Sequence, residues 1–302
     1  MSIDSDDDLT ALRRVGRLVG EALAAMEAAA TPGMTTAELD GIGASVLKAA
    51  GARSAPQLVY GFPGFNLLSV NDEIVHGIPG PRRLRPGDVV KLDVTAELDG
   101  YIADAARTVV LPPSRSVARR LRDSARRAFD RAAAVARAGE LVSSIGHEVE
   151  HSVRADRFSV VRALTGHGVG RTIHEPPSVP NYFDHRQRDV LTEGLVLTIE
   201  PIISERPCRA VDDGDGWTVR TSNGSLSAHY EDTIVITSGA PIVLTALSAR
   251  PPPAVTCRCS ARTPRRMRSP SGTPPAGRSP SSCASTTSPT TTGGFSGRRS
   301  SH

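Results

Sequence analysis

The chain has 302 residues, of which 39% are hydrophobic and 23% are charged, a composition that permits a globular enzyme and excludes a fibre or a coiled coil. The net charge of +4 is uneven, because residues 250–302 contain nine Arg and no Lys, Asp or Glu, which leaves residues 1–249 at about −5 (+4 minus +9). No apolar run reaches the roughly 18 residues of a membrane span, and the first eight residues are acidic where a signal peptide is basic, so we expect a cytoplasmic protein.

The first segments with helical hydrophobic spacing are two predicted helices. The first covers residues 9–30 and ends before the turn signal at residues 31–33 (TPG). The second begins at Thr35, because residues 35–38 (TTAE) have the form of a capping box, and it stops at Gly51. We expect these two helices to pack as a pair.

Between Gln57 and Leu111 the hydrophobic period changes to that of strands, with Gly, Pro and Asn-Asp between short β-rich runs. The predicted strands cover residues 59–60, 66–70, 88–95 and 101–110. The same order then recurs, with helices at residues 116–138 and 143–156 and strand-like runs up to Leu244. A repeated order of helix, helix and sheet predicts two similar α+β halves around one sheet system.

The Arg-, Pro-, Ser- and Thr-rich residues 249–302 have no hydrophobic periodicity, which predicts a disordered tail after a body of residues 1–248. Two interpretations of the tail stay open. Its arginines could bind ribosomal RNA electrostatically. Alternatively, it is a solvated or out-of-frame extension from GC-rich DNA, the interpretation that we prefer.

One short motif, residues 147–151 (HEVEH), matches the H-E-x-x-H pattern, in which two histidines on one helix face bind zinc. A pattern this short recurs by chance. The apolar residues Ile145, Val149 and Val153 would face a core, so we expect the two histidines on a solvated flank of their helix and not at a metal.

Carboxylates inside apolar strands make a stronger candidate site. Asp93 and Asp104 lie on two predicted strands joined by a turn, which could bring both side chains to one face. Glu200 and Glu231 interrupt two further apolar runs, and His167 lies among glycines that permit close approach of a ligand. Buried carboxylates repel one another, so a cation between them is the simplest compensation; the alternative is that they reach solvent at strand ends. Four carboxylates and one imidazole suit a pair of Mn, Fe, Co or Zn ions.

Around these residues the chain resembles the type I methionine aminopeptidases, over about residues 9–245. The matching segments, in order, are 69–79 (SVNDEIVHGIP), 93–95 (DVT) with Asp104, 166–170 (GHGVG) with 174–175 (HE), 198–201 (TIEP), 216–219 (GWTV) and 227–233 (SAHYEDT). The resemblance implies the α+β pita-bread (creatinase/aminopeptidase) fold, with two pseudo-symmetric halves and helices packed outside a curved antiparallel sheet. It also implies removal of the initiator methionine from nascent proteins when the second residue is small.

Carried over position by position, the resemblance implies two divalent metal ions per chain, of Co, Mn, Fe or Zn. Asp93 would chelate one ion, and His167 and Glu200 the other. Asp104 and Glu231 would bridge the two. The resemblance further implies that a hydroxide held between the ions attacks the first peptide carbonyl.

The resemblance also implies roles for side chains around the metals. Glu200 would transfer the proton, while His76 and His174 would contact the substrate and stabilise the tetrahedral intermediate; a purely structural role is the alternative for these two histidines. Phe62 and Trp217 match apolar walls of the methionine pocket.

Several positions depart from the pattern of the family. Val59 and Phe62 stand where tyrosines are usual, Ile173 stands where an aromatic ring is common, and His229 replaces a residue that is more often Gln. The first three substitutions keep the wall apolar, so methionine should still fit. The sequence does not give the consequence of His229.

The implied partners are the N-termini of nascent polypeptides, with transient ribosome association, no membrane and a monomeric state. A first rival is a proline-directed peptidase of the same fold, but such relatives usually have a large extra amino-terminal domain. A second rival is a non-catalytic binding protein of the same fold that has lost its metal ligands. The presence of all five ligand residues in this chain argues against it.

Overall fold

The computed structural model describes residues 1–246, so the predictions for residues 249–302 lie outside the described residues. The five helices of this part are α1 (Asp6–Ala29), α2 (Thr36–Ala49), α3 (Ala55–Tyr60), α4 (Ser116–Val135) and α5 (Val142–Ala155). Among these, none combines the length and the apolarity that crossing a bilayer demands.

Strands make up most of the remaining structure. They are β1 (Arg53–Ser54), β2 (Leu67–Val70), β3 (Glu73–Val75), β4 (Val89–Leu98), β5 (Tyr101–Val110), β6 (Ser159–Val160), β7 (Thr165–Gly168), β8 (Glu175–Pro180), β9 (Val196–Ile199), β10 (Ile202–Ser204), β11 (Ala210–Asp212), β12 (Val219–Thr221), β13 (Ser227–His229), β14 (Glu231–Val235) and β15 (Ile242–Val243).

Helix caps fix the starts of the first two helices. The Ser5 side chain accepts a hydrogen bond from the backbone N–H of Asp8 at the start of α1, whose acidic first turn also suits the helix dipole. At α2 the predicted capping box is present, since Thr35 and Glu38 each accept a backbone N–H from the other.

The predicted strand at residues 59–60 is wrong, because these residues end the short helix α3. Ser54 caps this helix by accepting the N–H of Gln57, Pro56 lies in its first turn, and Gly61 closes it with φ 73°. These local signals outweigh the β-propensity of Val59, which lies half-exposed.

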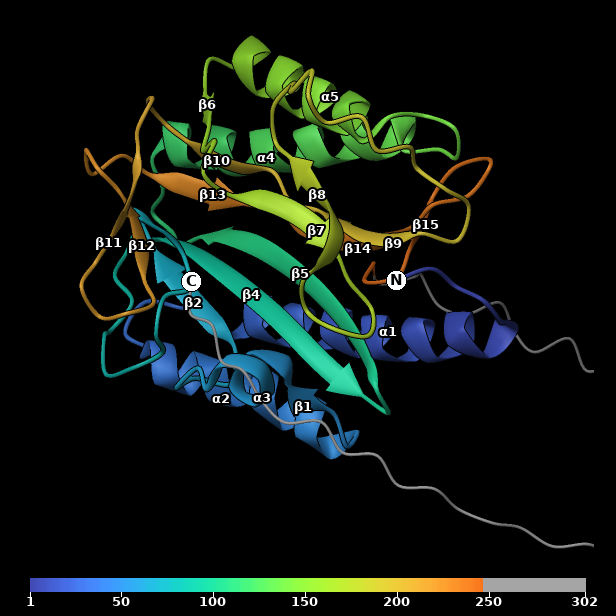
Figure 1. Cartoon of the computed structure of the whole chain (residues 1–302). Helices are drawn as coiled ribbons and strands as arrows, with labels where there is room; N and C mark the ends of the chain where they lie inside the picture. Colours follow the sequence, from blue (N-terminus) through green and yellow to red (C-terminus); the bar gives the residue numbers. More distant parts are fainter. Residues whose placement is uncertain (247–302) are drawn as a thin grey trace, which may run out of the picture. The chain divides into compact units, whose positions relative to one another are not determined.

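A nine-stranded antiparallel sheet forms the centre of the described chain, in the order β1-β4-β5-β14-β9-β7-β8, with β2 also on β4 and β15 also on β14. Its longest pair is the β4–β5 hairpin, whose register runs from Val89 opposite Val110 to Leu98 opposite Tyr101. Two three-stranded sheets, β13-β10-β6 and β11-β12-β3, flank it. The pairs α1/α2 and α4/α5 lie on opposite sides of the strands (Figure 1), as the two-halves prediction expects.

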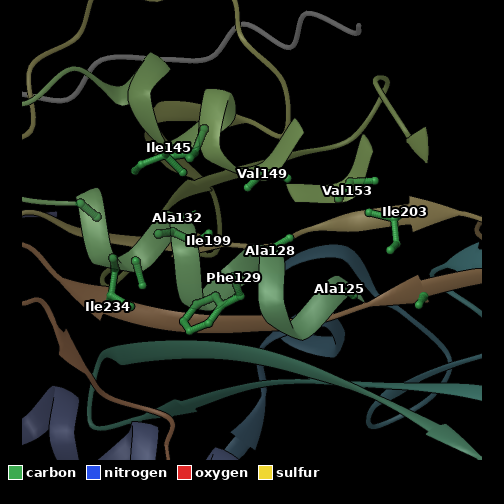
Figure 2. Packing of buried hydrophobic residues seen from close by; sticks show 14 of the residues in the cluster. Ala125, Ala128, Phe129, Ala132, Ile145, Val149, Val153, Ile199, Ile203 and Ile234 are labelled. Carbon is green, nitrogen blue, oxygen red and sulfur yellow. The ribbon is translucent and has the colours of Figure 1, made fainter. Parts of the chain in front are cut away.

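Each helix pair covers its own hydrophobic core. The core on the α4/α5 side gathers small residues of α4 around Phe129, with Ile145 and Val149 of α5 and Ile199 and Ile234 of the sheet (Figure 2). The core on the other side packs α1 against β4 and β5, and α2 against α1 and β2. The sheet is thereby held from both sides, which fixes the register of the strands that carry the site.

Replacing Phe129 by Ala should lower the free energy of unfolding by about 3–5 kcal/mol, because a large ring that is 4% exposed leaves a cavity between α4 and the sheet. Urea denaturation at a fixed metal concentration measures this. Leu58→Ala, at a side chain that is 50% exposed, is the control and should change it by about 0.5 kcal/mol or less. Equal losses in the two variants would contradict the assigned core.

Candidate metal centre

Strand register brings three acidic side chains to one face of the central sheet. Asp93 on β4 lies opposite Ala106 on β5, and Ala106 lies opposite Glu231 on β14. Asp104 lies two residues before Ala106, so its side chain points to the same face. The hairpin geometry expected for Asp93 and Asp104 is therefore present, and β14 adds Glu231 beside them.

The second half of the sheet supplies Glu200 and His167. Glu200 directly follows β9, whose Ile199 pairs with Asp232, so Glu200 lies next to Glu231. His167 on β7 donates its backbone N–H to the hydroxyl of Thr198 at 3.2 Å. Its Nδ1 lies 3.0 Å from the Gly168 carbonyl, an acceptor only, so Nδ1 is protonated and Nε2 stays available as a ligand.

Four of the five residues predicted to bind metal are buried, and Asp93 is partly exposed. Ligand atoms of Asp104, His167 and Glu231 lie within 4.8 Å of one another. Within residues 1–246, Asp104 Oδ1 and Glu231 Oε1 have no hydrogen-bond partner. Oxygen-rich clusters with an imidazole suit divalent transition-metal ions, so the donor set fits the implied metals.

Mutual repulsion is visible in the pKa values of the carboxylates. Burial, and next the carboxylate of Glu200, raise the pKa of Glu231 to about 7. Burial and then Glu231 raise the pKa of Asp104, and burial and then Asp104 raise that of Asp93. Without metal, these groups are therefore harder to ionise than exposed carboxyls, and a bound cation would favour their charged forms.

An additional imidazole, that of His229 at the end of β13, lies inside the carboxylate cluster. Its Nε2 is 3.3 Å from Glu231 Oε2 and 3.5 Å from Glu200 Oε2. Burial alone would lower the pKa of His229, but the two carboxylates outweigh burial and raise this pKa to about 10. The sequence indicated only that the residue was unusual at its position.

The two histidines expected to contact substrate lie at the edge of the cluster. The His174 ring is 4.3 Å from that of His167, between centroids. Burial, then His167 and His76, lower the pKa of His174 to about 4, so its imidazole is neutral at pH 7. Burial, and next His229, likewise lower the pKa of His76.

Tyr60 is a contact of the site that the sequence did not reveal. Its hydroxyl lies 2.6 Å from Nδ1 of His174, which fixes the orientation of that ring. The two residues are 114 positions apart in the chain, and the segment of Tyr60 was predicted as a strand, so no local pattern could have paired them.

A cavity of about 440 Å³ opens onto the cluster. Its apolar wall includes Phe62 and Trp217, whose rings meet edge to face with centroids 5.1 Å apart, together with Ile173. Its floor contains the five predicted metal ligands, with His229, His76 and His174. Val59 does not line this cavity and is half-exposed.

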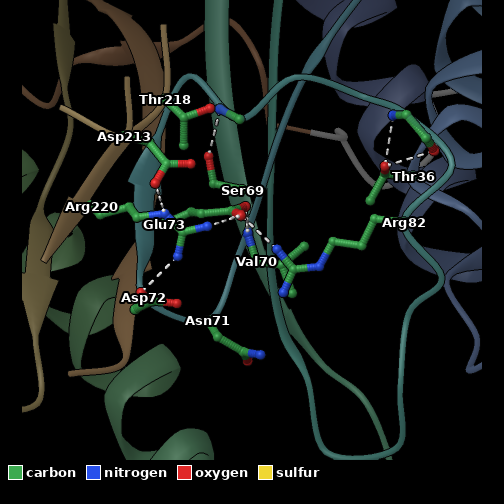
Figure 3. A network of polar contacts seen from close by, with 12 residues as sticks. Thr36, Ser69, Val70, Asn71, Asp72, Glu73, Arg82, Asp213, Thr218 and Arg220 are labelled. Carbon is green, nitrogen blue, oxygen red and sulfur yellow. Dashed lines mark hydrogen bonds and ion pairs between the residues drawn. The ribbon is translucent and has the colours of Figure 1, made fainter. Parts of the chain in front are cut away.

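An ion-pair network links β3 to β12 (Figure 3). His76 directly follows β3, and Trp217 lies two residues before β12. Arg220 on β12 contacts Asp72 at 2.8 Å and Glu73 at 3.1 Å. Glu73 also pairs with Arg82 and accepts the Val70 N–H, so several partners hold this buried carboxylate.

The H-E-x-x-H motif lies elsewhere, on α5. Val149 and Val153 of this helix are buried, while the His147 side chain is 59% exposed, as the sequence predicted. The rings of His147 and His151 stack with centroids 6.1 Å apart, and neither joins a cluster of ligands among residues 1–246.

The fold and the cluster together define a metal-binding enzyme of the pita-bread class. The chain belongs to metallopeptidase family M24, whose family model matches residues 10–238, so the family predicted from the sequence is confirmed.

Known relatives agree with this assignment. The chain is 41% identical to a protein named methionine aminopeptidase 2 from Bacillus subtilis over 249 residues, which are 82% of this chain and 100% of the relative. A crystal structure of methionine aminopeptidase from Thermotoga maritima matches with a TM-score of 0.79 and 32% identity, covering 81% of this chain and 99% of that one. A prolidase from Pyrococcus horikoshii shares the fold, with a TM-score of 0.65 at 22% identity, and this chain matches 63% of its length.

Chelator-treated protein should lose stability as pH rises. The folded pKa of Glu231, about 7, exceeds its ordinary value of 4.5, so stability that is fully present below pH 4.5 is lost as pH approaches and passes 7. The pKa of His229 is raised from 6.5 to about 10, so this residue adds a further loss of folding stability between pH 6.5 and pH 10. We expect a melting temperature several degrees lower at pH 9 than at pH 6, since 1 kcal/mol corresponds to about 2–4 °C at this size.

Adding Mn²⁺ or Co²⁺ at pH 8 should restore the lost stability, because the ions bind the folded cluster and not the unfolded chain. Thermal unfolding followed by circular dichroism measures both effects. A melting temperature that responds to neither pH nor metal would contradict the assigned centre.

Proposed function

We propose that this protein is a methionine aminopeptidase that removes the initiator methionine from nascent proteins when the second residue is small. One observation supports this most strongly: a single cavity joins an apolar wall, suited to a thioether side chain, to a floor of four carboxylates and His167. The membership of family M24 and the names of the relatives support the same activity.

In this proposal Asp93, Asp104, His167, Glu200 and Glu231 hold two divalent ions. When bound, the ions would supply an acidified water and polarise the scissile carbonyl. We assign residues 1–248 to the catalytic domain. Proton transfer and stabilisation of the developing charge are carried out by side chains at the ions and around them.

Glu200 holds and transfers the proton in this mechanism. Burial raises its pKa, so a carboxyl at this position can accept a proton from the attacking water and pass it to the leaving amine. Its position directly after β9 places it beside Glu231 and keeps its backbone fixed by the sheet.

His174 and His76 stabilise the developing negative charge on the carbonyl oxygen. The Tyr60 hydroxyl lies 2.6 Å from Nδ1 of the neutral His174 imidazole. In the proposed mechanism this hydroxyl donates to Nδ1, and Nε2 carries the proton that is offered to the substrate. The substrate methionine side chain packs against Phe62 and Trp217, which excludes water from the first peptide bond.

The proposed partners are the N-termini of nascent chains, and the proposed place of action is the cytoplasm. Ribosome association and a monomeric state stay predictions. A proline-directed peptidase is the alternative within the fold, and substrate choice separates it from the methionine enzyme.

Chelator-stripped protein re-supplied with Mn, Co, Fe or Zn should release free methionine from Met-Ala-Ser and much less from Met-Leu peptides, because the proposed site accepts a small second residue. Chromatography of the released amino acid gives kcat/KM. Asp104→Asn should lower kcat/KM by more than about 100-fold, beyond the 10–100-fold typical for partners outside the ligand set.

His147→Gln serves as the matched control, since it removes an exposed histidine on α5 and should leave turnover unchanged. Preferential cleavage of Ala-Pro peptides would move the assignment to the proline-directed peptidases. No release with any of the four metals would refute the proposed activity.

A further inference from the structure

We propose that His229 is an additional protein ligand of the metal centre, so that two imidazoles rather than one contribute to it. The inference rests on the proposed function only in assuming that Glu200 and Glu231 bind metal. His229 thereby receives a role, which the sequence alone did not give.

The distances around His229 match those between ligands of a common ion better than those of hydrogen bonds. Its Nε2 lies 3.3 Å from Glu231 Oε2 and 3.5 Å from Glu200 Oε2. Hydrogen bonds from N–H to oxygen usually span about 2.7–3.2 Å. Two ligand atoms bound tetrahedrally at about 2.0–2.1 Å to one ion lie about 3.3–3.4 Å apart.

Burial leaves the imidazole with no other polar partner. His229 is 1% exposed, and neither ring nitrogen has a hydrogen-bond partner among residues 1–246. Buried polar groups in folded proteins nearly always have a partner. Ligand atoms of Glu200, His229 and Glu231 all lie within 4.8 Å of one another, so an ion among them could bind Nε2 and both carboxylates at once.

Backbone contacts hold His229 in this position. Its N–H donates to the hydroxyl of Thr108 at 2.9 Å, and that hydroxyl donates back to the His229 carbonyl at 2.7 Å. On its other side, His229 pairs with Ile202 of β10. The residue is therefore fixed between β5 and β10, with its ring against the carboxylates.

A second nitrogen ligand has a consequence for metal preference. Imidazole suits Zn, whereas carboxylate and water suit Mn, and a site with nitrogen ligands generally binds Co²⁺ more tightly than Mn²⁺. With His167 and His229 both available, the centre should favour Co²⁺ and Zn²⁺ over Mn²⁺ more strongly than it would with His167 alone.

The test compares the metal affinities of the full-length protein with those of His229→Gln, which keeps a polar side chain but removes the imidazole. Competition with a chromophoric chelator gives Kd for Co²⁺, Zn²⁺ and Mn²⁺. We expect the Co²⁺ and Zn²⁺ affinities to fall about 10–100-fold and the Mn²⁺ affinity to change by less than about threefold. His147→Gln is the matched control and should match the parent protein.

Unchanged Co²⁺ and Zn²⁺ affinities in a folded His229→Gln variant would overturn the inference. A second measurement uses the parent protein and so does not depend on the folding of a variant. Bound Co²⁺ shifts the N–H proton of each coordinated imidazole far outside the normal proton NMR range. We expect two such resonances, from His167 and His229, and a single one would overturn the inference.

Methionine release by the Co²⁺-loaded parent protein, measured in parallel, separates the two proposals. Absence of release with two shifted imidazole resonances would refute the proposed activity and leave His229 as a ligand. Normal release with one resonance would refute the role of His229 alone.

Discussion

The burial of four carboxylates against one another is the constraint on which the rest of the structure depends. Asp93, Asp104, Glu200 and Glu231 lie on a sheet face where each raises the cost of ionising another, and burial raises the pKa of every one of them. A fold that only had to be stable would place apolar side chains there. Such a cluster therefore indicates a site where a cation belongs, and the M24 membership of the chain agrees.

The two halves of the fold each supply part of the proposed ligand set. The β4–β5 hairpin supplies Asp93 and Asp104, and the later strands β7, β9 and β14 supply or adjoin the others. The two helix pairs pack on opposite sides of the strands (Figure 1). A shift in strand register would therefore expose residues of both cores, so the register that aligns the carboxylates is fixed. The wall is held separately, by the pairing of β3 with β12 and the ion pairs of Arg220 (Figure 3).

Much of this could be predicted from the sequence, because its signals are local or belong to the family. The bounds of β5 and the capping box of α2 follow from residue patterns alone. The five proposed ligands followed from apolar strands interrupted by acids, together with the resemblance. Contacts between distant segments could not be predicted: Tyr60 reaches His174 across 114 positions, and the environment of His229 depends on carboxylates from β9 and β14. The helix α3 was missed because the prediction gave more weight to the β-favouring Val59 and Tyr60 than to the capping Ser54, the early Pro56 and the closing Gly61.

The proposed role of the carboxylate cluster is to hold a pair of divalent ions. The most direct measurement is anomalous X-ray diffraction at the cobalt absorption edge, from crystals of the full chain grown with Co²⁺. We expect two anomalous peaks inside the cluster, between Asp93 and Asp104 on one side and His167 and Glu200 on the other. Absence of density there, or a peak only beside His147 and His151 on α5, would contradict it.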